Sequence, residues 1–324
     1  MPNISPVAGW SLDYIFALDL NRPGTAGEFL RASPERRQVI AALLSMTPLP
    51  SEPGQAKELA KFTSGGGHRE ILTAAFGSVP SGLRGALARS GPQPQPRSFY
   101  RTLHHLLSEP SKANVGRAIQ QLDSLDLMRL RIAQTLPADI CTANLIKLVG
   151  SMRTASDVAK LIDLMAKGGI DRVALAQALG RVATDTQLSE FWDRWTQKLT
   201  FPQHPVPRTA NYTPVTEGAA LRQLALRYRN CARRYLAQVL DGNDAFAEFA
   251  VGGNRAVIHL HKHGEVWRLE GMFAKDNGRI EPTLRAAAVS FLTDQGVQTA
   301  QIVPEKGGEW AVLRRLSGVH MFGF

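Results

Sequence analysis

The sequence predicts a chain of two parts, an all-helical N-terminal domain over residues 1–200 and a small α+β domain with an antiparallel β-meander over residues 215–324. Three observations support this multi-domain prediction. Short amphipathic segments recur roughly every fifteen residues in the first part. Residues 201–214 carry four prolines and no periodicity, which is typical of a linker. After them, short apolar runs alternate with glycine turns, as in hairpins.

Helix-start signals support the helical part. Thr25 and Glu28 have the spacing of a capping box, and Ser33 precedes Pro34 as an N-cap precedes a first helical residue. The Pro-rich residues 91–97 subdivide the region. The spacing indicates paired antiparallel helices that stack as in a solenoid. Further helices are expected at residues 55–62, 68–76, 80–89, 98–108, 111–122, 124–135, 138–150, 155–167, 171–182 and 185–198.

The α+β part opens with a predicted long helix from Glu217 to Leu240. Three strands are then expected within AFAEFAV, RAVIHLHK and EVWRLEGMFA, joined by tight glycine turns. The segment IEPTLRAAAVSFLTDQG predicts a further helix, with Gly296 at its C-terminal end. VQTAQIVP and EWAVLRRL are expected to form edge strands.

The composition is that of a soluble globular protein, with 44% hydrophobic and 20% charged residues. No apolar run is long enough to suggest a membrane span, so no membrane partner is expected. The N-terminus has no basic region ahead of an apolar stretch and carries Asp13, so we expect a cytoplasmic protein.

The two cysteines, Cys141 and Cys231, lie far apart in apolar surroundings and form no CxxC pair. Buried reduced thiols are the expected interpretation, and no cofactor is implied. The alternative for Cys231 is a thiol–imidazole pair with one of the histidines near residue 260.

The net charge of +10 favours an anionic partner, with nucleic acid first. No acidic residue occurs between Glu217 and Asp241, so the arginines of the predicted long helix lack the neighbours that would neutralise them along the helix. Such a row suits phosphate oxygens, although an ordinary solvated helix face is the alternative. The candidate nucleic-acid-binding residues are Arg222, Arg227, Arg229, Arg233 and Arg234.

A histidine cluster is the main catalytic candidate. On a strand, His259 and His261 point to one face, about 7 Å apart. Glu270 and Arg268 on the next strand are placed to face them, and one more carboxylate such as Glu248 would complete a metal or acid–base site. The alternative is that the histidines line the solvent side of the meander.

The segments GAALRQLALRYRNCARRYLAQVLDG and AVIHLHKHGEVWRLEGMFAKDNGRIEP, followed by a helix ending in SFLTDQG, resemble the C-terminal domain of PcfJ-like proteins of conjugative plasmids and phages. The residues that match are Glu217-Gly218, Cys231, Tyr235, Glu270 and Asn277, whereas Asn230 stands where the family usually has histidine. The resemblance covers roughly the last third of the chain. It implies association with mobile elements and DNA transfer rather than a defined reaction.

Three functions follow as hypotheses. The first is a non-enzymatic basic accessory protein of a mobile genetic element or defence system, which binds nucleic acid or a nucleoprotein and contacts proteins through its helical N-terminal region. The second is a metal-dependent nuclease that uses His259, His261 and Glu270. The third is an interaction scaffold whose helical region binds an acidic protein.

Overall fold

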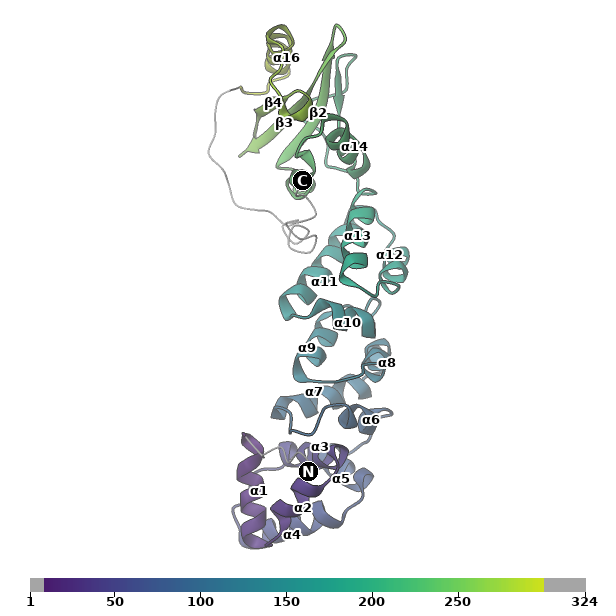
Figure 1. Ribbon diagram of the computed structural model, residues 1–324, viewed down its shortest axis with the longest axis vertical. Coiled ribbons are helices and arrows are strands. Elements are labelled where there is room, and N and C mark those ends of the chain that lie inside the picture. The colour runs from purple at the N-terminus through teal and green to yellow at the C-terminus, as the bar shows by residue number, and fades with distance from the viewer. Residues whose placement is uncertain (1–8, 300–324) are drawn as a thin grey trace. The chain divides into compact units, whose positions relative to one another are not determined.

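The computed structural model describes residues 9–299. Contacts divide the chain into two compact units, residues 1–155 and residues 156–324 (Figure 1). The predicted fold class is confirmed, because the first unit is helical and the second contains a four-stranded antiparallel sheet with helices on both of its faces.

The helices of the first unit lie close to their predicted positions, and the helix from His68 to Phe76 has the predicted bounds. The helix from Trp10 to Asn21 was not predicted. The bounds are α1 (Trp10–Asn21), α2 (Thr25–Arg31), α3 (Pro34–Met46), α4 (Pro53–Gly65), α5 (His68–Phe76), α6 (Leu83–Ala88), α7 (Arg97–Ser108), the 3₁₀ turn η1 (Pro110–Lys112), α8 (Ala113–Gln120), α9 (Leu127–Thr135) and α10 (Ala143–Val149).

Helix α3 is the central helix of this unit, and it contacts α1, α5, α6 and α7. Every residue from Gln38 to Ser45 is buried, because helices pack against several sides of this stretch. The predicted N-cap is confirmed, because the Ser33 side chain accepts a hydrogen bond of 3.2 Å from the backbone N–H of Arg36.

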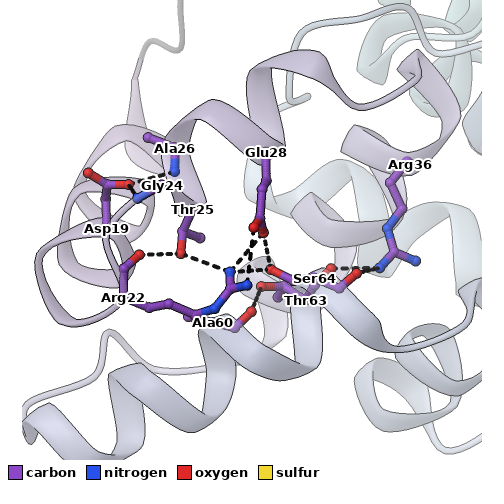
Figure 2. A network of polar contacts seen from close by, with 10 residues as sticks. All are labelled: Asp19, Arg22, Gly24, Thr25, Ala26, Glu28, Arg36, Ala60, Thr63 and Ser64. Carbon is purple, nitrogen blue, oxygen red and sulfur yellow. Dashed lines mark hydrogen bonds and ion pairs between the residues drawn. The ribbon is translucent and has the colours of Figure 1, made fainter.

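The predicted capping box at Thr25 is wrong. Thr25 is the first residue of α2, and Gly24 precedes it with a left-handed φ of 99°. The backbone N–H groups of Gly24 and Ala26 instead donate hydrogen bonds to the carboxylate of Asp19, at 3.0 and 2.8 Å (Figure 2). A side chain from the preceding helix therefore caps α2, which frees Glu28 for another contact.

Glu28 joins α2 to the end of α4. Its carboxylate accepts hydrogen bonds from Arg22 at 2.7 Å and from the Ser64 hydroxyl at 2.5 Å, as Figure 2 shows. Nearby, the Arg36 guanidinium donates to the backbone carbonyls of Thr63 and Gly66, both at 2.6 Å. The cation of α3 thus satisfies carbonyls that the C-terminus of α4 leaves without a helical partner.

The second unit places a sheet between two helical layers, after three further helices. The strand order is β1-β2-β3-β4, all antiparallel. The bounds are α11 (Met152–Lys167, whose first residues belong to the first unit), α12 (Arg172–Leu179), α13 (Asp185–Thr196), β1 (Tyr212–Pro214), α14 (Gly218–Tyr228), the 3₁₀ turn η2 (Ala232–Tyr235), α15 (Leu236–Leu240), β2 (Asp244–Val251), β3 (Asn254–His263), β4 (Val266–Phe273), the 3₁₀ turn η3 (Lys275–Asn277) and α16 (Pro282–Asp294).

The two faces of the sheet bury different cores, as the alternation of its strands requires. One face presents residues such as Ala247, Ile258 and Leu260 to α16. The other presents Phe246 and Val257 to α14 and η2. The three predicted strands of the meander are confirmed, and β1 is an addition.

The predicted long helix from Glu217 to Leu240 is wrong, because α14 ends at Tyr228. Arg229 takes a left-handed φ of 48°, and the Asn230 side chain accepts the N–H of Ala232 at 3.1 Å. This local side-chain bond replaces helical hydrogen bonding, so the chain continues as a 3₁₀ turn and a short helix.

The Pro-rich residues 201–214 pack onto the second unit. Val206 is fully buried in the core between the sheet and α16. At one edge of the sheet, β1 is only three residues long and ends in Pro214. At the other edge, the backbone of Gln298 bonds to Trp267 and Leu269 of β4, so part of the expected strand at 297–304 is a single bridge. The expected strand at 309–316 lies outside the described residues.

None of the helices described between Gly9 and Thr299 combines the length and the apolar character that crossing a bilayer requires.

Replacing Glu28 tests the contact between α2 and α4. Hydrogen bonds from Arg22 and Ser64 lower the pKa of the Glu28 carboxyl from 4.5 to about 2. Its contribution is therefore present above the unfolded pKa and is lost as the pH falls from about 4.5 to about 2. Because the pair is partly exposed, Glu28→Gln should lower the free energy of unfolding near neutral pH by less than about 1 kcal/mol. In urea titrations across this pH range the variant should lose less stability on acidification than the wild type.

Glu58→Gln, on the exposed side of α4, is the matched control, and an equal effect of both variants would contradict the assignment.

The two thiols should differ in reactivity. Cys141 is buried, its thiol donates to the carbonyl of Ala133 at 3.7 Å, and burial raises its pKa to about 12. Cys231 is only half-buried. An aromatic disulfide reagent should therefore titrate one thiol in the native protein and the second only after denaturation, since the thiolate is the reactive form. Cys231→Ser should abolish the native reaction, and a fast reaction in that variant would contradict the burial of Cys141.

Candidate functional site on the helix-covered face of the sheet

The arginines expected to be unneutralised are paired, so that expectation is wrong. Arg222 of α14 lies 3.5 Å from the carboxylate of Asp193, and Arg233 of η2 donates a hydrogen bond to the same carboxylate. Asp193 belongs to α13, forty residues before Arg233 in the sequence. Acidic residues are absent from the helix itself, but the fold brings one to it.

The other arginines of the row also meet carboxylates. Arg227 lies 2.5 Å from Glu248 of β2, and Arg229 lies 4.0 Å from Asp276 of η3. Arg255 of β3, which was not predicted, lies 2.9 Å from the same Glu248. Glu248 is therefore held by two guanidinium groups and is not available to the histidines.

Arg234 lies on η2 with an exposed side chain. The break at Asn230 separates it from α14, so the five predicted arginines do not form one row on one helix. Arg222 and Arg233 contact Asp193, Arg227 contacts Glu248, and Arg229 contacts Asp276, while Arg234 is exposed on η2.

The histidines gather around a buried carboxylate. Nε2 of His259 and Nδ1 of His261 lie 2.7 and 3.1 Å from Oδ1 of Asp244, whose side chain is 3% exposed. A carboxylate only accepts, so each of these ring nitrogens carries the hydrogen that it donates. The alternative that the histidines line the solvent side is wrong for His259, which is buried beneath η2.

Aromatic side chains enclose His259. The Phe246 ring stacks on the imidazole at 4.4 Å and 7°, and the Tyr235 ring packs edge-on at 4.5 Å. Burial raises the pKa of Tyr235, and the charges of Cys231, Asp244 and Glu270 raise it further. The cluster is thus a packed polar group, in which one carboxylate accepts a hydrogen bond from each imidazole.

The residues of the nuclease hypothesis do not assemble as predicted. Glu270 is exposed on β4 and makes no hydrogen bond to either histidine in the described chain. Over residues 9–299, no group of three or more His, Cys, Asp or Glu side chains is placed to hold a metal ion. Arg268 does pair with His261 in the strand register, as predicted.

Asp244 was missed in the sequence, although the signal was there. The turn at Gly252-Gly253 fixes the register of β2 on β3, which sets Asp244 opposite His261 and Phe246 opposite His259. Counting back from this turn would have found the carboxylate. Asp193 and Arg255 carry no comparable local signal.

Two residues of the PcfJ resemblance have structural explanations. Gly218 begins α14 against α13, where a Cβ would lie 2.2 Å from the backbone oxygen of Thr196. Tyr235 covers His259, as described above. Glu270 and Asn277 have no such packing role, and both line a pocket beside β4.

Removing Asp244 should destabilise the second unit. In Asp244→Ala, the N–H groups of the buried His259 and the half-buried His261 lose their acceptor, which should cost about 1–3 kcal/mol. Asp294→Ala, at the exposed end of α16, is the control and should stay within about 0.5 kcal/mol of the wild type. Urea midpoints measure both, and equal midpoints for the two variants would refute the structural role of Asp244.

Comparison with known proteins finds no family model that matches the chain, and neither a curated protein nor a solved structure gives a significant match. The resemblance to PcfJ-like proteins stays a prediction from the residues that carry it.

Proposed function

We propose that the chain is a non-enzymatic basic accessory protein that binds nucleic acid through Arg227, Arg229 and Arg255, here called the arginine surface. Arg227 and Arg229 belong to the row expected from the sequence, and Arg255 of β3 meets Arg227 at the carboxylate of Glu248. The net charge of +10 supports an anionic partner.

The observation that carries the proposal is the sharing of one carboxylate by two arginines. Glu248 accepts from Arg227 at 2.5 Å and from Arg255 at 2.9 Å, so the three side chains together keep a positive charge. Each guanidinium has five N–H donors, and a single carboxylate contact leaves most of them for phosphate oxygens.

The ion pairs of the arginine surface do not block it. The side chains of Arg227, Arg229 and Arg255 are 54%, 67% and 59% exposed. Exposed ion pairs contribute little to stability. A phosphate can therefore displace the carboxylate, or bind the N–H groups that the carboxylate leaves free. Glu248 also restrains two long side chains before binding, which lowers the entropy that binding has to overcome.

Arg222 and Arg233 are left out of this surface. Both hold Asp193 and so connect α13 to α14 and η2, which is a role in the fold. We further propose that the protein acts in the cytoplasm and contacts protein partners through its helical N-terminal region. Its link to a mobile genetic element or a defence system rests on the PcfJ resemblance.

Reversing the charge of the arginine surface tests the proposal. The variant Arg227→Glu/Arg229→Glu/Arg255→Glu should bind labelled single- and double-stranded DNA and RNA at least tenfold more weakly at moderate salt. If each arginine contacts one phosphate, the slope of log affinity against log salt should fall by about 2 to 3 on duplex DNA. Fluorescence anisotropy over a salt series measures both quantities.

The matched control reverses three exposed arginines elsewhere, Arg101, Arg131 and Arg181, and changes the net charge equally. It should keep most of the affinity, because only position distinguishes it. Equal losses in the two variants would mean that net charge alone acts, which overturns the assignment to this surface. A wild-type protein that retains no nucleic acid at low salt would overturn the proposed function itself.

A further inference from the structure

A second polar site lies beside β4. It is a pocket of about 720 Å³, within the range of roughly 300–1,000 Å³ that is usual for small-molecule sites. Strand β4, η3 and the start of α16 form its walls. The residues that line it are Leu269, Glu270, Gly271, Met272, Phe273, Asn277, Gly278, Arg279, Ile280, Arg285 and Thr299.

Two of the lining residues are arginines without a partner. Arg279 and Arg285 are exposed, and neither makes an ion pair or a hydrogen bond through its side chain within residues 9–299. This distinguishes them from the arginines around α14, which meet Asp193, Glu248 or Asp276. An unpaired guanidinium in a hollow is suited to bind an anionic oxygen.

The N-terminus of α16 does not supply the anion site. The carboxylate of Glu281 already accepts the N–H groups of Thr283 and Leu284, at 3.2 and 3.1 Å. The cationic side chains that line the pocket and are placed to hold an anion are therefore Arg279 and Arg285.

A strained turn brings Asn277 to the pocket wall. Asp276 and Asn277 have φ values of 58° and 53°, and Arg229, which contacts Asp276, has 48°. These are the non-glycine residues with positive φ in the described chain, and all of them lie where α14 meets η3. Asp and Asn adopt left-handed backbone more readily than other non-glycine residues, and such backbone gathers at ligand sites, where it positions a side chain.

The opposite wall provides an acceptor and an apolar surface. Glu270 is the unpaired residue of a β-bulge, because His259 pairs with Gly271 and Leu260 with Leu269. Its carboxylate makes no hydrogen bond in the described chain and so is free to accept from hydroxyl groups. Phe273 lies beside it, and its ring covers Gly271 so closely that a Cβ there would be 2.4 Å away.

We propose that this pocket binds a nucleotide, with its phosphate on Arg279 and Arg285, its ribose hydroxyls on Glu270 and its base against Phe273 and neighbouring apolar side chains. A carboxylate in an anion site argues against a bare phosphate, whereas a nucleotide has both a phosphate and hydroxyl donors. The ligand is a free nucleotide or the terminal nucleotide of a strand, because the recognised groups are the same. The inference does not depend on the arginine surface.

A pocket of the first unit, beside Arg22 and Glu28, offers no such site. Its volume is about 600 Å³, and its polar lining includes Arg22, Glu28 and Ser64, which are bound to one another. A ligand there would have to displace these contacts.

Calorimetric titration of the full chain tests the proposal with ribonucleoside monophosphates, the matching nucleosides and inorganic phosphate. A nucleotide should bind at least tenfold more tightly than its nucleoside or phosphate alone, since both groups are held. Arg279→Ala/Arg285→Ala should weaken nucleotide binding about tenfold to a hundredfold, through lost charge-assisted hydrogen bonds. Glu270→Gln should reduce the preference for a ribonucleotide over its 2′-deoxy counterpart.

Arg181→Ala/Arg208→Ala is the matched control and should bind like the wild type, because both residues are exposed and lie outside the pocket. Arg227→Glu/Arg255→Glu should lose polynucleotide but keep mononucleotide binding, so the two proposals fail separately.

A 5′-phosphorylated oligonucleotide that displaces the nucleotide at lower concentration would assign the site to strand ends, and failure to displace it would assign the site to free nucleotides. Absence of nucleotide binding by the wild type at millimolar concentration, or unchanged binding by the Arg279/Arg285 variant, would overturn the inference.

Discussion

The path of the chain after α14 depends on one local hydrogen bond, in which the Asn230 side chain accepts the backbone N–H of Ala232. This contact ends α14 and turns the chain into η2, so that Tyr235 lies over His259. It also leaves Arg229 directed toward Asp276. A continuous helix through this stretch would place neither side chain where it is, since its residues would advance by a fixed angle along one axis.

In the second unit, single carboxylates contact two basic side chains each. Asp193 and Glu248 each serve two arginines, and Asp244 serves two histidines. One acceptor for two donors satisfies polar groups near the sheet and preserves positive charge at the surface. These contacts therefore have two effects. Asp244 and Asp193 connect elements of the fold, and Glu248 holds exposed cations in place.

The sequence predicted well whatever depends on short-range pattern. Helix α5 and the three strands of the meander follow from periodicity and glycine turns, and the Ser33 cap follows from its own residue type. It failed where a side chain from a different helix or strand makes the contact. Asp19 displaced the predicted cap at Thr25, and Asp193 neutralised arginines that lack acidic neighbours on their own helix. The break at Asn230 was missed because apolar spacing continues through it, and the pocket was missed because a bulge and a strained turn leave no periodic signal.

The edges of the sheet have a consequence for self-association. The short outer strand β1 ends in Pro214, which has no N–H to donate, and Gln298 occupies backbone groups of Trp267 and Leu269 on the far side. The bulge at Glu270 interrupts the regular spacing that an incoming strand would need. A sheet bordered in this way resists growth by strand addition between molecules, so it can carry an apolar interior on both faces without seeding fibrils.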